Sequence, residues 1–233
     1  MYPRLQNLFL NSLGEASDSS VTALADVVTL PAQSILIEQG APTQYVYLLT
    51  SGLASMVNTM PDGSTAEVGV CGREGPIGAA DLFGQGSTGC IMQIAGDGLR
   101  IPVDAFRQLL HESAEVRGRT LEFMQNTIAG LGQISACNRL HSAEARLARW
   151  LLMVQDRVEG KTVPVKQACL AQMLGSRRTT ITMAAAIMKR NGWIGYNRGR
   201  IQILDRRLLK SAACTCYPVL DRLYRELYST ASL

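Results

Sequence analysis

The chain has 233 residues, of which 47% are hydrophobic and 18% charged, a composition that excludes a disordered chain. Its longest uncharged stretch, residues 39–61, contains Gln, Pro, Asn, Ser and Gly and is typical of strands and turns, not of a membrane span. Residues 1–140 carry 7 basic against 13 acidic residues, whereas residues 161–233 carry 13 against 3. We therefore expect two domains with different partners, and the basic C-terminal domain favours a polyanion, nucleic acid before a membrane.

Targeting and redox signals indicate a cytoplasmic protein. Residues 1–8 lack the basic segment and apolar run of a secretory signal. The six cysteines include no Cys-x-x-Cys pair, and the two histidines are His111 and His141. We expect reduced, mostly buried thiols and neither a zinc nor an iron–sulfur site. Cys214 and Cys216 form a Cys-x-Cys pair, which is predicted to pack the terminal helices. A metal site at this pair is the alternative, but the sequence suggests no metal-ligating partners near it.

The front of the chain predicts β structure. Short apolar or alternating segments, such as residues 45–49, lie between Gly, Pro and Ser residues. Asp62-Gly63 separates the segments 54–59 and 65–70, and this dipeptide supplies the positive φ angle that a tight hairpin needs. Asp97-Gly98 is a further predicted turn. Strands and turns at this spacing favour an antiparallel roll or barrel.

Helical spacing begins at about Val103 and predicts a long helix with two apolar stripes. The first stripe has the spacing of a coiled-coil seam and consists of Leu121, Met124, Ile128 and Leu131. The second stripe is expected to cover the β domain and consists of Phe123, Thr127, Gly130, Ile134 and Cys137. We expect the first stripe to pair with a second copy of the chain, although a core helix of a monomer would show the same spacing. A further helix is predicted from Ser142, its N-cap, to about Val154.

Residues 166–203 contain the most specific pattern in the chain. A short helix over 166–174 is followed by Gly175-Ser176, and a second helix is predicted from Arg177 to Arg190. Gly175 suits the turn of a helix-turn-helix, and Ser176 is expected to cap the second helix. In this motif the N-terminal residues of the second helix meet base edges in the major groove of DNA.

The segment after these helices predicts a basic hairpin. Ile201 and Ile203 alternate with polar residues, and residues 197–199 form a turn. Arg198 and Arg200 at the tip of such a hairpin, or wing, can bind phosphate. An arginine-tipped hairpin on an ordinary α+β domain is the alternative, but the order of helix, turn, helix and basic wing favours DNA binding.

At these residues the chain resembles the Crp/Fnr superfamily of bacterial transcription regulators, and the likeness covers nearly its whole length. Residues 172–182 are similar to that family's Gly-x-Ser-Arg-x-Thr-Val turn, and residues 137–152 and 204–217 are similar to one of its subgroups. The resemblance implies an α+β fold with an antiparallel β-roll of the cyclic-nucleotide-binding jelly-roll type. A dimerisation helix over about 113–140 and a C-terminal winged helix-turn-helix complete this fold.

The resemblance also implies domain limits and partners. A sensor domain with the dimerisation helix is expected over residues 1–140, and a DNA-binding domain with C-terminal helices over residues 141–233. The implied function is a homodimeric, sequence-specific transcription regulator that binds a palindromic operator in double-stranded DNA. RNA polymerase at promoters is the further implied partner, and no association with a membrane is expected.

At the DNA, the resemblance assigns roles to individual residues. Arg178 falls where the family places its base-reading arginine, which suits a bidentate contact to guanine. Thr179 and Met183 fall where cyclic-AMP-responsive members carry a Glu and a second Arg, so we expect a different operator. The expected DNA-contacting residues, base-reading and phosphate-binding together, are Arg177, Arg178, Thr179, Thr180, Thr182, Met183, Lys189, Arg198 and Arg200.

The resemblance places a candidate effector pocket in the β-roll. It consists of Gly78, Ala79, Ala80, Gly89 and Cys90. Where cyclic-nucleotide members hold the ribose with a Glu and neutralise the phosphate with an Arg, this chain has Ala79 and Gly89. No Lys or Arg occurs from residue 74 to residue 99, and a buried phosphate without a cation costs several kcal/mol. We therefore expect no cyclic AMP binding in the usual mode and predict no cofactor.

Other modes of regulation and other functions stay open at this point. Cys169, with Lys166 near it to favour the thiolate, is a candidate redox thiol whose oxidation would weaken DNA binding, but a small filler is the plainer interpretation. An unidentified small molecule could also gate the regulator. The alternative function is a ligand-binding sensor that docks a protein partner. Paired carboxylates beside a His, a nucleophile motif and a phosphate-binding loop are all missing from the sequence, so no enzyme is predicted.

Overall fold

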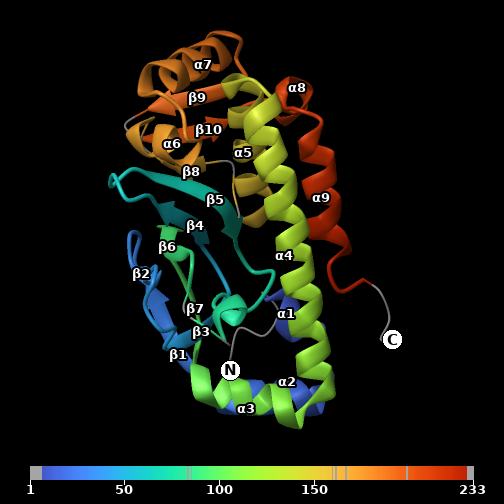
Figure 1. The fold of residues 1–233 in the computed structure, drawn as a ribbon. Coiled ribbons are helices and arrows are strands. Elements are labelled where there is room, and N and C mark those ends of the chain that lie inside the picture. Colours follow the sequence, from blue (N-terminus) through green and yellow to red (C-terminus); the bar gives the residue numbers. More distant parts are fainter. Residues whose placement is uncertain are drawn as a thin grey trace.

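The long helix α4 (Ala114–Leu140) runs along two lobes, a β-sheet lobe and a second lobe built mainly of helices (Figure 1). This computed structural model describes residues 7–229 except residues 83, 85, 159, 161, 166 and 198, and it describes only the backbone of residues 167 and 168. The arrangement confirms the predicted α+β class with an antiparallel β domain, a long helix and a C-terminal helix-turn-helix. Within these described residues, every helix is too short or too polar to cross a membrane.

The β-sheet lobe contains two antiparallel sheets. The first has the strand order β1 (Asp26–Leu30), β7 (Gly96–Pro102), β3 (Tyr45–Leu49). The second has the order β2 (Ile35–Ile37), β6 (Gly89–Ile94), β4 (Leu53–Thr59), β5 (Thr65–Cys71). The predicted hairpin is confirmed, because β4 pairs with β5 across the Asp62-Gly63 turn and Gly63 has a φ angle of +82°.

The predicted turn at Asp97-Gly98 is wrong. Both residues lie in β7, the central strand of its sheet, where Gly98 pairs with Val28 of β1 and Leu49 of β3. A Cβ atom on Gly98 would lie 2.7 Å from the carbonyl oxygen of Leu48. This glycine therefore permits a close approach of neighbouring backbones and does not mark a chain reversal.

Helices α2 (Glu15–Ala23) and α3 (Val103–Glu112) cross the end of the β-sheet lobe, and the short α1 (Leu8–Asn11) precedes them (Figure 1). Phe9, Val21 and Phe106 from these helices are fully buried in one cluster with Val46 and Ile101 of the first sheet. This cluster closes the lobe because each helix buries its apolar side against the apolar face of the sheet.

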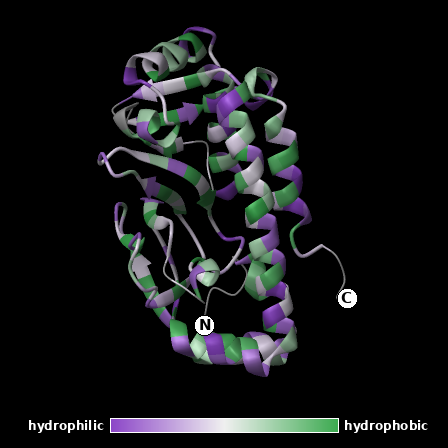
Figure 2. Cartoon of the chain, in the orientation of Figure 1, coloured by the Kyte–Doolittle hydropathy of each residue, from purple (hydrophilic) through white to green (hydrophobic). Residues whose placement is uncertain are grey.

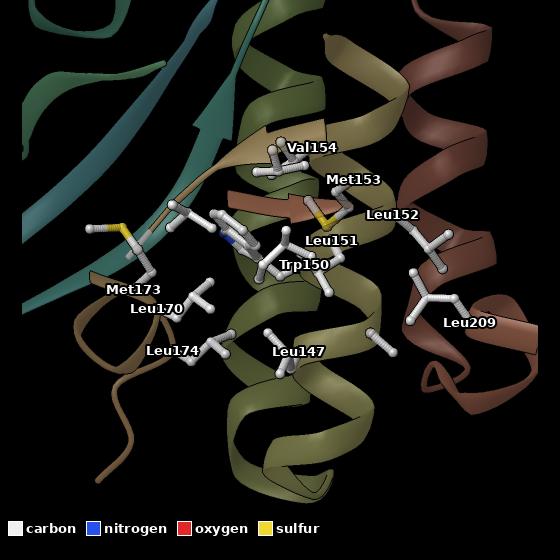
Figure 3. Close-up of a cluster of buried hydrophobic side chains, with 14 of the residues drawn as sticks. Leu147, Trp150, Leu151, Leu152, Met153, Val154, Leu170, Met173, Leu174 and Leu209 are labelled. Atoms are coloured by element: carbon white, nitrogen blue, oxygen red, sulfur yellow. The ribbon is translucent and has the colours of Figure 1, made fainter. Parts of the chain in front are cut away.

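The second lobe is built around α5 (Ala143–Arg157), and Ser142 is its N-cap as predicted. Around α5 lie α6 (Gln167–Met173), α7 (Arg178–Arg190), α8 (Arg206–Ala212) and a sheet of β8 (Thr162–Pro164), β10 (Arg200–Ile203) and β9 (Ile194–Asn197). Figure 3 shows Leu147, Trp150 and Leu151 of α5 among side chains from α6 and α8. The last helix, α9 (Cys216–Glu226), returns along α4, where Asn126 Nδ2 donates to the Leu223 carbonyl at 2.8 Å.

The two lobes share a buried contact between α5 and the second sheet. Trp150 Nε1 donates to Glu67 Oε1 at 2.7 Å, and Ser55 Oγ donates to Glu67 Oε2 at 2.6 Å. Burial raises the pKa of the Glu67 carboxyl to about 7, although both hydrogen bonds and the charges of Arg149 and Arg157 oppose this shift. The contact therefore joins the lobes through a carboxyl group that titrates near neutral pH.

Candidate functional site

Helices α6 and α7 form a helix-turn-helix whose turn depends on Gly175. The Leu174 amide donates to the Leu170 carbonyl, and the chain then reverses at Gly175, which has a φ angle of +53°. This backbone conformation is strained for residues with a Cβ atom, so the glycine is required by the turn. The predicted helix end is also confirmed, since α7 ends at Arg190 and Gly192 has a φ angle of +73°.

The prediction that Ser176 caps α7 is wrong. The N-cap is Arg177, which makes no side-chain capping hydrogen bond. Ser176 Oγ instead accepts from Arg146 Nη2 at 2.7 Å and donates to the Leu174 carbonyl at 3.2 Å. Arg146 lies on α5, so a long-range contact ties the turn to the core helix, and the amides at the start of α7 keep no side-chain cap.

The two faces of α7 differ in burial and charge. Ile181, Ala184, Ala185 and Met188 are buried against the core of the lobe. Outside this buried face, the predicted DNA-contacting residues of α7 and its N-cap are exposed, and only Thr182 among them is half-buried. The exposed residues are Arg177, Arg178, Thr179, Thr180, Met183 and Lys189. Met183 is 67% exposed, and α7 contains no acidic residue. The N-terminal half of α7 therefore offers arginine, threonine and a free apolar side chain to a ligand.

The predicted wing is the hairpin of β9 and β10. The two strands pair in register from Asn197–Arg200 to Ile194–Ile203, and Gly199 at the tip has a φ angle of +75°. Arg200 is exposed, whereas Arg198 lies outside the described residues. β10 also pairs with β8, so the wing is the edge of a three-stranded sheet and is held at a fixed place beside α7.

Helix α4 leaves part of its first apolar stripe uncovered. Leu121 and Ile128 are 57% and 68% exposed, and Met124 and Leu131 are half-buried. Hydrophobic and hydrophilic residues alternate along this helix (Figure 2). The second stripe packs inward, since Phe123, Ile134 and Cys137 are buried. Phe123 covers the β-sheet lobe as expected, whereas Ile134 and Cys137 belong to the cluster built around α5. Pairing of the first stripe with a second copy stays a prediction.

A cavity of about 240 Å³ lies between the β-roll and α4. Its lining includes Gly78, Ala80, Gly89 and Cys90 of the predicted pocket, whereas Ala79 is fully buried and does not line it. Helix α4 adds Phe123, Met124, Thr127, Ile128 and Leu131, and the strands add Met56 and Cys71. The resemblance points to Leu131, which falls where the family's dimerisation helix meets its ligand. Sequence reasoning did not assign the other residues to the pocket, because they come from elements that only the fold brings together.

The described lining of this cavity carries an acidic residue and no basic one. Asp81 is the one charged residue among the described lining residues, and burial raises the pKa of its carboxyl. Burial, and in second place the Asp81 charge, raises the pKa of the Cys90 thiol to about 12, so this thiol stays protonated at neutral pH. Such a lining disfavours a phosphate anion, because a buried anion needs a cation or several hydrogen-bond donors.

The candidate redox thiol, Cys169, lies where α6 meets the β-sheet lobe. It is half-buried, and its Sγ atom accepts from Gln93 Nε2 of β6 at 3.3 Å. Lys166, which was expected to favour its thiolate, lies outside the described residues. None of the six cysteines forms a disulfide. A redox role for Cys169 stays a prediction.

The expectation that Cys214 and Cys216 have no metal-ligating partners is wrong. Cys137 and His141, at the C-terminal end of α4, lie beside them, and the four ligand atoms all lie within 4.8 Å of one another. The Cys137 and Cys214 Sγ atoms are 3.4 Å apart, and Cys216 Sγ is 3.5 Å from His141 Nδ1. Three thiols and an imidazole can hold a soft divalent metal ion. The Cys-x-Cys spacing was a signal, but its partners lie more than 70 residues away in the sequence.

Models of two known protein domains match the sequence, one in each lobe. A model of the cyclic nucleotide-binding domain matches residues 13–113, and a model of the Crp-like helix-turn-helix domain matches residues 145–212. A CRP-like cAMP-activated global transcriptional regulator from Mycobacterium tuberculosis is 22% identical over 206 residues, 84% of this chain and 91% of its own. Transcriptional regulator SdrP from Thermus thermophilus is 26% identical over 199 residues, 83% of this chain and 96% of its own.

Solved structures share the fold. The crystal structure of a Crp/Fnr-family regulator from Eubacterium rectale matches with a TM-score of 0.68 and 19% identity, covering 87% of this chain and 95% of its own. At this identity the match establishes the architecture of the lobes and nothing about ligands.

Proposed function

The chain belongs to the Crp/Fnr superfamily of transcription regulators, with a cyclic nucleotide-binding domain and a Crp-like helix-turn-helix. From this premise we propose that it acts as a homodimer that binds a palindromic operator in double-stranded DNA. The partners that follow are a second copy of the chain, the operator and, at promoters, RNA polymerase in the bacterial cytoplasm.

The observation that carries the proposal is the exposed, acid-free N-terminal half of α7. Arg177 and Arg178 stand there with Thr179, Thr180 and Met183, all of them exposed. A guanidinium group suits a bidentate contact to guanine, hydroxyl groups suit phosphate, and an exposed methionine suits the methyl group of thymine. This combination favours DNA over an acidic protein partner, because reading a base needs both polar and apolar contacts.

The dimer is supported by the uncovered stripe on α4. Leu121 and Ile128 are large, exposed apolar residues that lie one heptad, or about two helical turns, apart on the same face of α4. Met124, Ile128 and Leu131 belong both to this stripe and to the lining of the cavity. A second copy on this face would therefore sit beside the cavity, so that occupancy of the cavity and the orientation of the two reading helices can be coupled.

The cavity suits a small ligand other than cyclic AMP. The relative from Mycobacterium tuberculosis is cAMP-activated, but the described lining here carries Asp81 and no basic side chain. We therefore propose that this domain binds a neutral or weakly polar effector, or that DNA binding by this protein is controlled without an effector.

Selection of random duplex DNA by the reduced, full-length protein tests this function. We expect enrichment of a palindrome whose half-site centres lie about 10–10.5 base pairs apart, because two reading helices on a two-fold dimer enter successive major grooves. The double variant Arg177→Ala/Arg178→Ala should lose the enrichment. Arg222→Ala, which removes a charge from an exposed position on α9, should keep it.

Two results would contradict parts of the proposal. A complete lack of DNA binding by the reduced protein would favour a sensor that docks a protein partner. Salt-sensitive binding without any enriched sequence would exclude a ligand-free dimer with its reading helices in register, and it would indicate that the cavity requires a ligand.

A further inference from the structure

Four side chains from two distant segments meet where α4 turns into α5, beside the start of α9. Cys137 lies in the last turn of α4, and His141 is the C-cap of that helix. Cys214 precedes α9, and Cys216 is the first residue of α9. We propose that Cys137, His141, Cys214 and Cys216 bind a structural zinc ion that fastens the end of α4 to the start of α9.

The distances fit a tetrahedral ion. Zinc binds sulfur at about 2.3 Å and imidazole nitrogen at about 2.0 Å, which places two sulfurs about 3.8 Å apart and a sulfur and a nitrogen about 3.6 Å apart. The Cys137–Cys214 distance is 3.4 Å, the Cys216–His141 distance is 3.5 Å, and all pairs of ligand atoms lie within 4.8 Å. Small side-chain movements would complete the site.

Each segment supplies two ligands by its local geometry. Residues four apart lie on the same face of a helix, so Cys137 and His141 point in one direction from the end of α4. Cys214 and Cys216 flank the entry into α9. The donor set of three thiolates and one imidazole is one of the standard sets of structural zinc sites, and its three soft sulfur donors exclude calcium and magnesium.

The surroundings of the cluster suit a negatively charged metal centre. Zinc with three thiolates and a neutral imidazole carries one net negative charge. The Arg149 guanidinium, 3% exposed, lies near enough to Cys137 to interact with its charge, and its Nε atom has no hydrogen-bond partner among the described groups. Gln133 Nε2 donates to Cys216 Sγ at 3.0 Å, as second-layer groups do at thiolate ligands.

The ion would act at the corner between α4 and α5. α4 ends at Leu140 and α5 begins at Ala143, so His141 and Ser142 form the corner between the long helix and the second lobe. A metal bond to His141 and to both cysteines before and within α9 fixes this corner from two sides. The metal site does not rest on the proposed DNA binding, and its test needs no DNA.

The test measures metal on the reduced, full-length protein. Zinc content is determined by elemental mass spectrometry, and after chelation the protein is titrated with Co²⁺. We expect a single zinc ion per chain and, with cobalt, the visible bands of a tetrahedral site together with thiolate-to-cobalt charge transfer. Zinc should also raise the melting temperature, because it binds the folded chain.

Variants separate this site from adventitious binding. In Cys216→Ser the charge-transfer intensity should fall in proportion to the thiolate removed. In His141→Asn it should persist while the visible bands shift and zinc binds at least about 100-fold more weakly. Cys169→Ser, which changes a thiol outside the cluster, should match the wild type in metal content and spectrum.

The proposal is overturned if the reduced wild type holds no zinc and gives no tetrahedral cobalt spectrum. It is also overturned if Cys216→Ser and His141→Asn leave that spectrum unchanged, or if mass mapping shows a Cys137–Cys214 disulfide in the reduced preparation. If either variant is unfolded, the wild-type cobalt titration alone decides, since its charge-transfer intensity reports the number of thiolates bound.

Discussion

The outer face of α7 and the cavity beside α4 differ in the anions that they can accept. The first carries Arg177 and Arg178 in solvent, without an acidic residue on the helix. The second is lined mainly by apolar side chains, with Asp81 as the charged group of its described lining. The outer face of α7 can therefore accept a phosphate backbone, whereas the described lining of the cavity offers no cation to a cyclic phosphate. We therefore propose DNA, but not cyclic AMP, as a ligand of this chain.

The largest expected effect concerns α4, which lines the cavity and carries the uncovered apolar stripe. Replacing Leu121 and Ile128 by Glu places charges on the uncovered stripe and should convert a dimer into monomers. Operator affinity should fall by about 100-fold or more, because each half-site is then bound alone. Sedimentation measures the conversion of dimers into monomers, and DNA titration measures the loss of operator affinity.

Leu140→Glu is the matched control for this pair. Leu140 is 75% exposed on the same helix but lies off the stripe, so its replacement should leave both the dimer and the affinity unchanged. A dimer that survives the double replacement would place the interface elsewhere.

A buried carboxyl group at the border of the lobes should give a pH-dependent stability. The pKa of Glu67 is about 7 in the folded chain against 4.5 as its ordinary value, so the folded state binds more protons than the unfolded state between these values. Its contribution to stability therefore decreases as the pH rises from about 4.5 to about 7. Glu67→Gln should raise the free energy of unfolding at pH 8 by about 3 kcal/mol and should flatten the pH profile.

Denaturant unfolding from pH 5 to pH 8 measures this effect. Glu38→Gln, at an exposed position, is the control and should follow the wild type. A pH profile that is the same in Glu67→Gln and the wild type would contradict the raised pKa.

A smaller effect is expected from a single base-reading side chain. Arg178→Ala should reduce discrimination at one base pair of each half-site by about 1–3 kcal/mol, with little change at the other positions. Titration of the protein with a set of single-base operator variants measures this loss of discrimination. A uniform loss over all variants would assign Arg178 to phosphate binding instead.

The smallest effect is expected from cyclic AMP. Millimolar cyclic AMP should leave the melting temperature and the operator affinity of this protein unchanged, because the described cavity lining has no cation for the phosphate. The cAMP-activated regulator from Mycobacterium tuberculosis serves as the positive control. A saturable shift with this chain would show that a residue outside the lining neutralises the phosphate.

Local signals in the sequence determined much of this fold. Gly175, the apolar spacing of α7 and the Asp62-Gly63 hairpin were all predicted correctly, because each depends on residues within a few positions of one another. The helical seam was equally visible, since a period of three and four residues is a property of one segment. For the same reason the exposed face of α7 could be predicted, apart from the half-buried Thr182.

Only the tertiary structure decided the features that depend on distant segments. Gly98 lies in a central strand because β1 and β3 pair on both of its sides. Ser176 binds Arg146 of α5 and therefore does not cap α7. The Cys-x-Cys pair meets Cys137 because α9 returns along α4. Neighbouring residues encode turns and helices, whereas contacts across 30 residues or more depend on how completed elements pack, and no local pattern records that packing.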